Sequence, residues 1–187
     1  MSELRSFLSP FSAVFISSSM NMKLRPFTMD DLDAMVHHAN NPKIAAMLTD
    51  AFPSPYTRDS GLLFLERVMA QEPAEVLAIE VDGEVVGNIG IHPQHDVNRL
   101  NAELGYFVGE EHWGKGIGTE AIRLMVKYAF DKFKIERIFA RPFGSNLASQ
   151  RVLEKAGFIF EARIPGILIK NGRTEDELFF GIRRKQL

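Results

Sequence analysis

Three glycines at every second position, followed by a helix-like segment, are the most distinctive chemical feature of the sequence. Gly114, Gly116 and Gly118 lie in the run HWGKGIGT at 112–119. Glycine lets a chain turn tightly and approach a ligand closely. A helix that begins there presents unpaired backbone N–H groups and the positive end of its dipole. The run therefore indicates a phosphate or pyrophosphate site, with a plain strand-to-helix turn as the alternative.

Two familiar phosphate motifs match this run only in part. Residues 109–115 match the start of a P-loop, but Gly116 stands where that motif has the Ser or Thr that binds magnesium. Gly116, Gly118 and Ala121 match a dinucleotide fingerprint, yet the glycines do not follow a strand directly, and Glu136 comes before its strand rather than at its end. A P-loop or dinucleotide-binding protein is therefore the less favoured interpretation.

A second pattern of polar and glycine positions lies downstream. Its members are Asn146, Ser149, Leu153, Lys155, Gly157 and Phe158. Together with the glycine run and the segment 103–106, this pattern resembles the GNAT superfamily of N-acetyltransferases, in the branch of ribosomal-protein N-terminal acetyltransferases and spermidine acetyltransferases. The resemblance covers about residues 23–184. Trp113 stands where the superfamily has Gln or Arg, a departure that is familiar in this branch.

The resemblance implies acetyl-CoA as acetyl donor and a site for it. The pantetheine arm would lie along a strand edge, and the pyrophosphate would lie on the glycine run. The implied cofactor-binding residues are Phe107, Val108, Trp113, Gly114, Lys115, Gly116, Ile117, Gly118 and Thr119, joined by Asn146 and Ser149. Among them Trp113 is expected to anchor the loop by packing.

Acetyl transfer to an amine needs a proton acceptor, because an ammonium group has no lone pair with which to attack a thioester. By the resemblance Glu103 is the candidate base, and a glutamate on a solvated strand face is the alternative. Leu153 occupies the place where many GNAT enzymes have a tyrosine that protonates the leaving thiolate. Asn146 and Ser149 are candidate catalytic residues near the sulfur, or else a helix cap and a first-turn polar residue.

The composition excludes several classes of function. With 22 basic and 24 acidic side chains the net charge is −2, so a nucleic-acid partner is not expected. The chain has no cysteine, which excludes disulfides, thiolate metal sites and an acyl-cysteine intermediate. We therefore expect direct transfer in a ternary complex by a cytoplasmic monomer or homodimer without a membrane partner.

The acceptor amine is not named by any motif. A protein N-terminus, a polyamine, an amino acid and a drug all stay open as acceptors. We expect the helices before Ala70, the loop 53–56 and the turn 169–173 to shape this choice. A non-catalytic acetyl-CoA-binding sensor that lacks the base is the alternative function.

No metal is expected from the histidine spacing. His92 and His95 lie three apart beside Asp96, but without a third spaced ligand we interpret them as part of an exposed loop. His37 and His38 are interpreted as ordinary histidines at the end of a helix.

Residues 1–22 are expected to form a loosely ordered N-terminal extension before a single domain at 23–187. Their apolar run is interrupted by Ser9, Pro10 and Ser12 and has no small-residue cleavage site, which argues against a signal peptide. Met20 and Met22 directly precede a strand-like segment, so the natural start is expected near them.

The remaining pattern predicts the elements that position these residues. Hydrophobic periodicity, Asp-Gly turn chemistry and Gly or Pro stops predict strands at 23–27, 76–81, 84–91, 102–108, 137–141, 158–164 and 173–183, and helices at 30–40, 42–48, 57–70, 118–131 and 146–156. The interleaving indicates a mixed α/β (α+β) layer. The resemblance implies the GNAT acyl-CoA N-acyltransferase fold, in which a central, mostly antiparallel sheet with splayed middle strands is flanked by helices.

Overall fold

The computed structural model describes residues 21–186. Most of the predicted extension 1–22 therefore lies outside the described residues, and with it the question of the natural start. Met22 is already the first residue of strand β1 (Met22–Arg25), one residue earlier than expected. Within 21–186, no helix combines the length and the apolar character needed to span a membrane.

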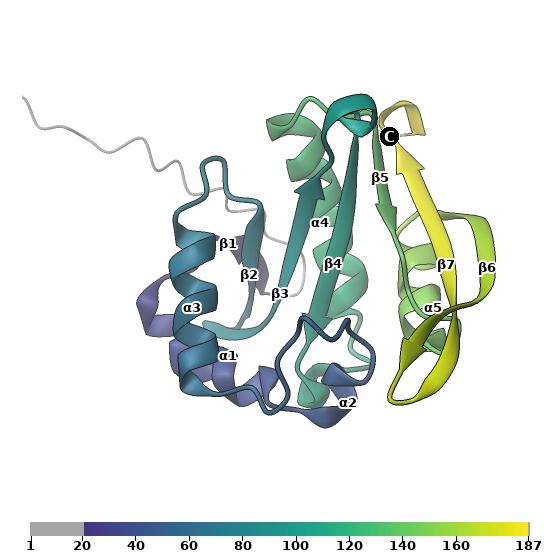
Figure 1. Ribbon diagram of the computed structural model, residues 1–187. Coiled ribbons are helices and arrows are strands. Elements are labelled where there is room, and N and C mark those ends of the chain that lie inside the picture. Colours follow the sequence, from purple (N-terminus) through teal and green to yellow (C-terminus); the bar gives the residue numbers. More distant parts are fainter. Residues whose placement is uncertain (1–20, 187) are drawn as a thin grey trace, which may run out of the picture.

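A single seven-stranded sheet organises the chain, in the order β1-β2-β3-β4-β5-β7-β6 (Figure 1). The further strands are β2 (Val76–Val81), β3 (Glu84–Pro93), β4 (Asn101–Val108), β5 (Arg137–Ala140), β6 (Ile159–Lys170) and β7 (Arg173–Arg183). Neighbouring strands are antiparallel except for β4 and β5, which are parallel. The predicted mixed fold with a mostly antiparallel sheet is confirmed.

Helices cover both faces of this sheet. They are α1 (Leu32–Ala39), α2 (Pro42–Ala45), α3 (Arg58–Met69), α4 (Ile117–Lys132) and α5 (Leu147–Lys155). In Figure 1, α1 and α3 lie in front of the sheet, whereas α4 passes behind it. Helix α2 is shorter than predicted, because after Ala45 the chain continues in single turns, such as the bond from Met47 N to Ile44 O.

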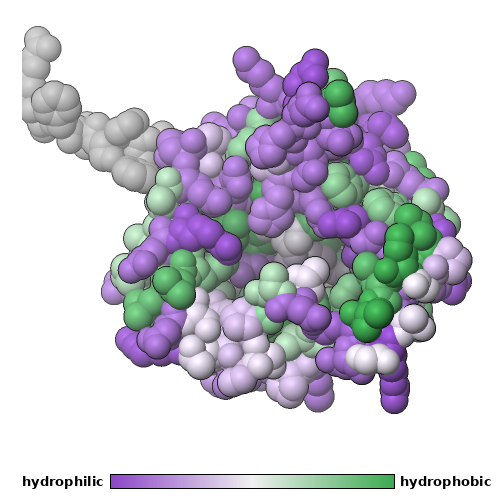
Figure 2. Space-filling model, viewed as in Figure 1, coloured by the Kyte–Doolittle hydropathy of each residue, from purple (hydrophilic) through white to green (hydrophobic). Residues whose placement is uncertain are grey.

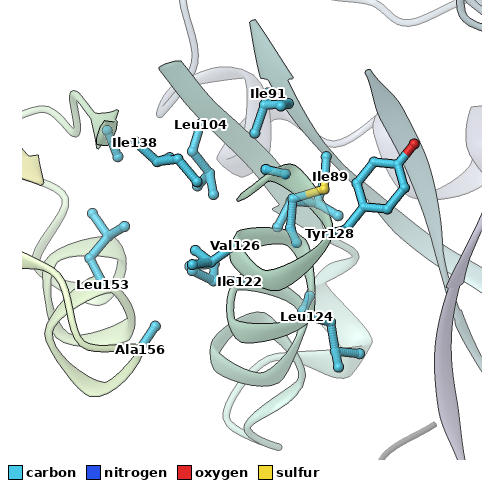
Figure 3. Packing of buried hydrophobic residues seen from close by; sticks show 14 of the residues in the cluster. Ile89, Ile91, Leu104, Ile122, Leu124, Val126, Tyr128, Ile138, Leu153 and Ala156 are labelled. Carbon is cyan, nitrogen blue, oxygen red and sulfur yellow. The ribbon is translucent and has the colours of Figure 1, made fainter. Parts of the chain in front are cut away.

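Two hydrophobic cores fill the space between the sheet and its helices. The larger packs α4 and α5 on one face of the central strands (Figure 3), and the smaller packs α1 and α3 on the other. The predicted inner face of α4 is buried throughout: Ile117, Ala121, Met125 and Tyr128 are each at most 6% exposed. Burial of a large apolar side chain stabilises the fold by about 1.5–3 kcal/mol. The buried face therefore determines how α4 is oriented on the sheet.

The turns follow the predicted chemistry. Asp82 and Gly83 join β2 to β3 with φ angles of 51° and 90°, as a type I′ hairpin requires. Asn171 and Gly172 join β6 to β7 with φ angles of 50° and 72°, a second turn of this kind.

Strand β6 is longer than the predicted 158–164. The pairing with β7 shifts register between Ile164 and Leu168, around Pro165 and Gly166, and then continues. As an edge strand, β6 carries exposed apolar side chains such as Ile167 and Ile169, at 55% and 73% exposure. Figure 2 shows a hydrophobic area at the right of the molecule, on the side where Figure 1 places β6 and β7.

Candidate functional site

Strands β4 and β5 separate after a short stretch of pairing. Their register joins Asn101, Ala102 and Glu103 to residues 137–139, whereas β3 accompanies β4 as far as Val108. The edge of β4 at 104–108 that faces away from β3 therefore has no β5 partner. Figure 1 shows the two strands close together at one end and diverging toward the other. An extended, amide-bearing ligand can hydrogen-bond to such a strand edge.

The glycine run leads from the end of β4 into α4. Gly114 and Gly116 have φ angles of 73° and 81°, a region that L residues with a side chain rarely adopt. Gly116 is the N-cap of α4, and no side chain caps the first amides. The predicted tight turn before a helix is confirmed, and the uncapped end of a sixteen-residue helix is suited to an anion.

Gly118 has a different role from the two glycines before it. It lies inside α4, and a Cβ built there would be 3.5 Å from both Tyr106 and Val152. These are ordinary van der Waals distances, so the packing of α4 against β4 and α5 does not itself require a glycine here. Lys115, Ile117 and Thr119 lie around it in the same run, with Ile117 buried and Lys115 exposed.

Trp113 ties the loop to the end of β4. Its indole Nε1 donates a hydrogen bond of 2.6 Å to the carbonyl oxygen of Val108, while the residue stays 47% exposed. The expected anchor is therefore formed mainly by a hydrogen bond rather than by burial. Phe107, next to Val108, is 6% exposed, because its face of β4 is covered by the core of α1 and α3.

The start of α5 faces β4 across the split. Asn146 caps this helix, since its Oδ1 accepts a 3.0 Å hydrogen bond from the backbone N–H of Ser149. The Ser149 hydroxyl oxygen lies 3.2 Å from the phenolic oxygen of Tyr106. Burial raises the pKa of Tyr106, so its hydroxyl keeps its proton at neutral pH. Sequence reasoning missed Tyr106 as a site residue. The one signal in the sequence is that Tyr106 brings a hydroxyl group into the alternating apolar positions of 102–108.

Glu103 is held by an arginine rather than left in solvent. Arg141, directly after β5, donates to both carboxylate oxygens of Glu103 at 2.9 Å, and also to Glu177 at 3.0 Å. By strand alternation Glu103 points to the same face of β4 as Phe107. The side chain of Glu103 is 27% exposed. Two carboxylates and one guanidinium leave a net negative charge where β4 and β5 separate.

A surface between α2 and the β6–β7 turn brings together the segments that we expected to shape acceptor choice. One cavity of about 330 Å³ is lined there by Pro42, Ala45, Ala46, Asp50, Phe52, Pro53, Ser54, Lys170 and Asn171. An adjoining cavity shares Lys170 and reaches Ser145, beside the cap of α5. Lys170 closes one side through a 2.7 Å ion pair with Asp50. Helix α2, the loop after it and the β6–β7 turn thus share one surface.

The predicted loop histidines do not gather ligands. Among residues 21–186, no group of three metal-ligating side chains includes His92 or His95, and both are exposed. His37 and His38, at the end of α1, instead lie close to the carboxylate of Glu111.

Comparison with known families gives one match over most of the chain. The family described as acetyltransferase (GNAT) domain matches residues 21–159. The chain is 41% identical over 101 residues to the probable N-acetyltransferase YjcK of Bacillus subtilis, covering 54% of this chain and 56% of that protein. It is 33% identical over 105 residues to the putative ribosomal N-acetyltransferase YdaF of the same organism, covering 56% and 57%. The aligned part thus spans little more than half of these relatives.

Solved structures share the fold over nearly the whole chain. Mycobacterium smegmatis RimJ in complex with CoA-disulfide superposes with a TM-score of 0.77 at 25% identity, covering 89% of this chain and 83% of that one. An acetyltransferase of the GNAT family from Bacillus anthracis superposes with a TM-score of 0.79 at 22% identity, covering 91% and 99%.

Proposed function

The chain belongs to the GNAT acetyltransferase family, and from that premise we propose that it transfers an acetyl group from acetyl-CoA to a primary amine. The observation that carries this proposal is the split between β4 and β5, which ends at the uncapped N-terminus of α4. One elongated ligand with an amide-bearing arm and an anionic end fits both features. The solved RimJ structure of the same fold is a complex with CoA-disulfide, which supports a CoA compound as the ligand.

In this proposal the cofactor is held mainly by backbone groups. The amides of 114–119 bind the pyrophosphate, and Lys115 adds a positive charge beside it. The free edge of β4 at Phe107 and Val108 pairs with the pantetheine arm. The Val108 carbonyl already accepts the Trp113 indole, so Trp113 fixes this edge rather than contacting the reacting atoms. The cap oxygen of Asn146 is in use, which leaves its amide N–H groups for the cofactor.

Glu103 is the group that we assign to the acceptor's proton. The attacking nitrogen needs a free lone pair, so its ammonium form must first lose a proton. Arg141 occupies one direction at each carboxylate oxygen, but a carboxylate has about four lone-pair sites in all. Glu103 can therefore accept a proton, directly or through one water, while Arg141 holds it in place.

Ser149 is the group that we assign to the departing thiolate. Tyr106 can donate a hydrogen bond to the Ser149 oxygen, which directs the serine O–H away from Tyr106. The serine O–H can then donate a hydrogen bond to the sulfur and stabilise the thiolate that leaves as the C–S bond breaks. The thiolate takes up a proton from solvent after it leaves. No cysteine is present, so the amine attacks acetyl-CoA directly in a ternary complex.

The acceptor is to be identified with a panel of amines. Purified full-length protein is incubated with acetyl-CoA and, separately, with peptides bearing a free N-terminus, polyamines, amino acids and amine drugs. Acetylated product is then measured by mass spectrometry. At least one class should be acetylated in proportion to enzyme concentration. Binding of acetyl-CoA without product from any class would favour a sensor instead.

A further inference from the structure

Two histidines and a glutamate from distant parts of the chain meet beside the cofactor loop. His37 and His38 end α1, and Glu111 lies in the short turn η3 (Glu110–His112) that directly precedes Trp113. One potential ligand atom from each of these three side chains lies within 4.8 Å of the others. His37 Nε2 is 3.0 Å from a carboxylate oxygen of Glu111.

His38 is buried with a polar atom left without a hydrogen bond. The residue is 4% exposed, and its Nε2 has no hydrogen-bond partner within residues 21–186. The closest opposite charge, Glu84 Oε1, is 3.7 Å away. A buried nitrogen without a partner costs free energy, so native proteins rarely leave one. The position of His38 therefore indicates a missing ligand.

The His38 ring is also held firmly in place. A Cβ at Gly109 would lie 2.3 Å from His38 Nδ1, so the imidazole packs directly on the backbone at the end of β4. The ring centroid of His112 is 5.4 Å from that of His38. A rigid imidazole with a second histidine nearby loses little freedom when it binds an ion.

Carboxylates near both histidines favour a cation as the missing ligand. Glu111 Oε1 is 3.0 Å from His37 Nε2, and Glu84 Oε1 is 3.7 Å from His38 Nε2. The neighbouring Glu110 is engaged with Lys43 and Asn41, so Glu111 is the carboxylate of the turn η3 that is available to an ion.

We propose that His37, His38 and Glu111 form a binding site for a divalent transition-metal ion of the zinc type. Two imidazoles and one carboxylate are a ligand set that zinc commonly uses. The exposed side chains of His37 and Glu111 can rotate to close on the ion, which would replace their mutual hydrogen bond. Water or His112 would complete four-coordination. The ion would join α1 to the turn before the glycine run.

The test is calorimetric titration of zinc chloride into tag-free, full-length protein that has been treated with a chelator. Wild type should bind one equivalent. The exposed ligands are replaced in His37→Gln and Glu111→Gln, and each variant should bind at least about ten-fold more weakly. The matched control is His95→Gln, an exposed histidine outside the cluster, which should bind like wild type. His38→Gln is not relied upon, because its burial can make that variant unstable.

A spectroscopic measurement gives a second, independent readout. Cobalt(II) in place of zinc should give visible absorption bands typical of imidazole and carboxylate coordination at low coordination number, and Glu111→Gln should reduce them. Zinc should raise the Tm of wild type more than that of His37→Gln. Equal zinc affinity in wild type, His37→Gln and Glu111→Gln, or no measurable zinc binding by wild type, would overturn the proposal.

Discussion

The guanidinium of Arg141 donates to both carboxylate oxygens of Glu103, at 2.9 Å each. Glu103 is the last residue of β4 that is in register with β5, and Arg141 directly follows β5. The pair therefore joins the two strands where they begin to separate. It places a fixed carboxylate beside the edge that we assign to acetyl-CoA.

Glu103→Gln should lower the acetylation rate at neutral pH by about ten- to a thousand-fold, the usual range for loss of a general base. The deficit should shrink near the pKa of the acceptor amine, because there the substrate arrives already neutral. The check is a pH profile of kcat/KM for both proteins. A loss of equal size at every pH would assign Glu103 to positioning, and an unchanged profile would remove it from the mechanism.

Gly116→Asp should weaken acetyl-CoA binding, because it puts a carboxylate at the helix end where the pyrophosphate would lie. Gly116→Asn is the matched control: it places an uncharged side chain of nearly the same size at φ 81°, a conformation that Asn and Asp both tolerate. Calorimetry should show a clearly larger loss of affinity for Asp than for Asn. Equal affinities in the two folded variants would contradict an anion site at Gly116.

Ser149→Ala should lower kcat at saturating acetyl-CoA by about a hundred-fold, because it removes a hydrogen bond to the departing thiolate. Tyr106→Phe should cause a smaller fall, because it removes only the hydrogen bond that orients the serine, and should cost about 1 kcal/mol of stability. Steady-state kinetics and urea unfolding measure the two effects. An unchanged kcat for Ser149→Ala would show that the thiolate is stabilised by another group.

The buried cluster around Arg25 should make the fold sensitive to acid. Arg25 donates to Asp31 and to Glu80, which are 6% and 7% exposed. Burial raises the pKa of both carboxyls, but it is outweighed by the hydrogen bonds and positive charge of Arg25 together with hydrogen bonds from Thr28 to Asp31 and from Lys23 to Glu80, so the net pKa values are lowered. Their contribution to stability is complete above the pKa of the unfolded chain and is lost as pH falls through the lower, folded values.

Arg25→Met should therefore destabilise the protein by about 3 kcal/mol at pH 7, since it leaves two buried carboxylates short of a partner. The difference from wild type should shrink as the medium becomes acidic and the carboxyls take up protons. Urea unfolding at neutral and acidic pH measures both values. A difference that stays constant across this range would contradict the assigned charge states.

Local features of the fold could be predicted from the sequence. The Asp82–Gly83 turn, the Asn146 cap and the inner face of α4 each depend on residues close together in the chain. Strand β6 continues beyond the predicted end at 164, because an edge strand accommodates Pro165 through a register shift.

The contacts that complete the site could not be predicted in the same way. Arg141 meets Glu103 from 38 positions away, and Ser149 meets Tyr106 from 43 away. Both pairs arise because β4 and β5 are parallel neighbours, which places Arg141 and the start of α5, both of which follow β5, beside β4. His37 and Glu111, 74 positions apart, meet only because α1 packs against the end of β4. Spacing along the chain carries no signal of these contacts.

The measurement that tests the central claim most directly is the joint yield of acetylated amine and free CoA in one reaction. Full-length protein is supplied with acetyl-CoA and the best amine of the panel, and both products are quantified over time. We predict equal amounts of the two at every time, no stable acetylated enzyme, and a much lower yield with Gly116→Asp. Free CoA that accumulates without acetylated amine, or equal yields from wild type and Gly116→Asp, would contradict acetyl transfer at this site.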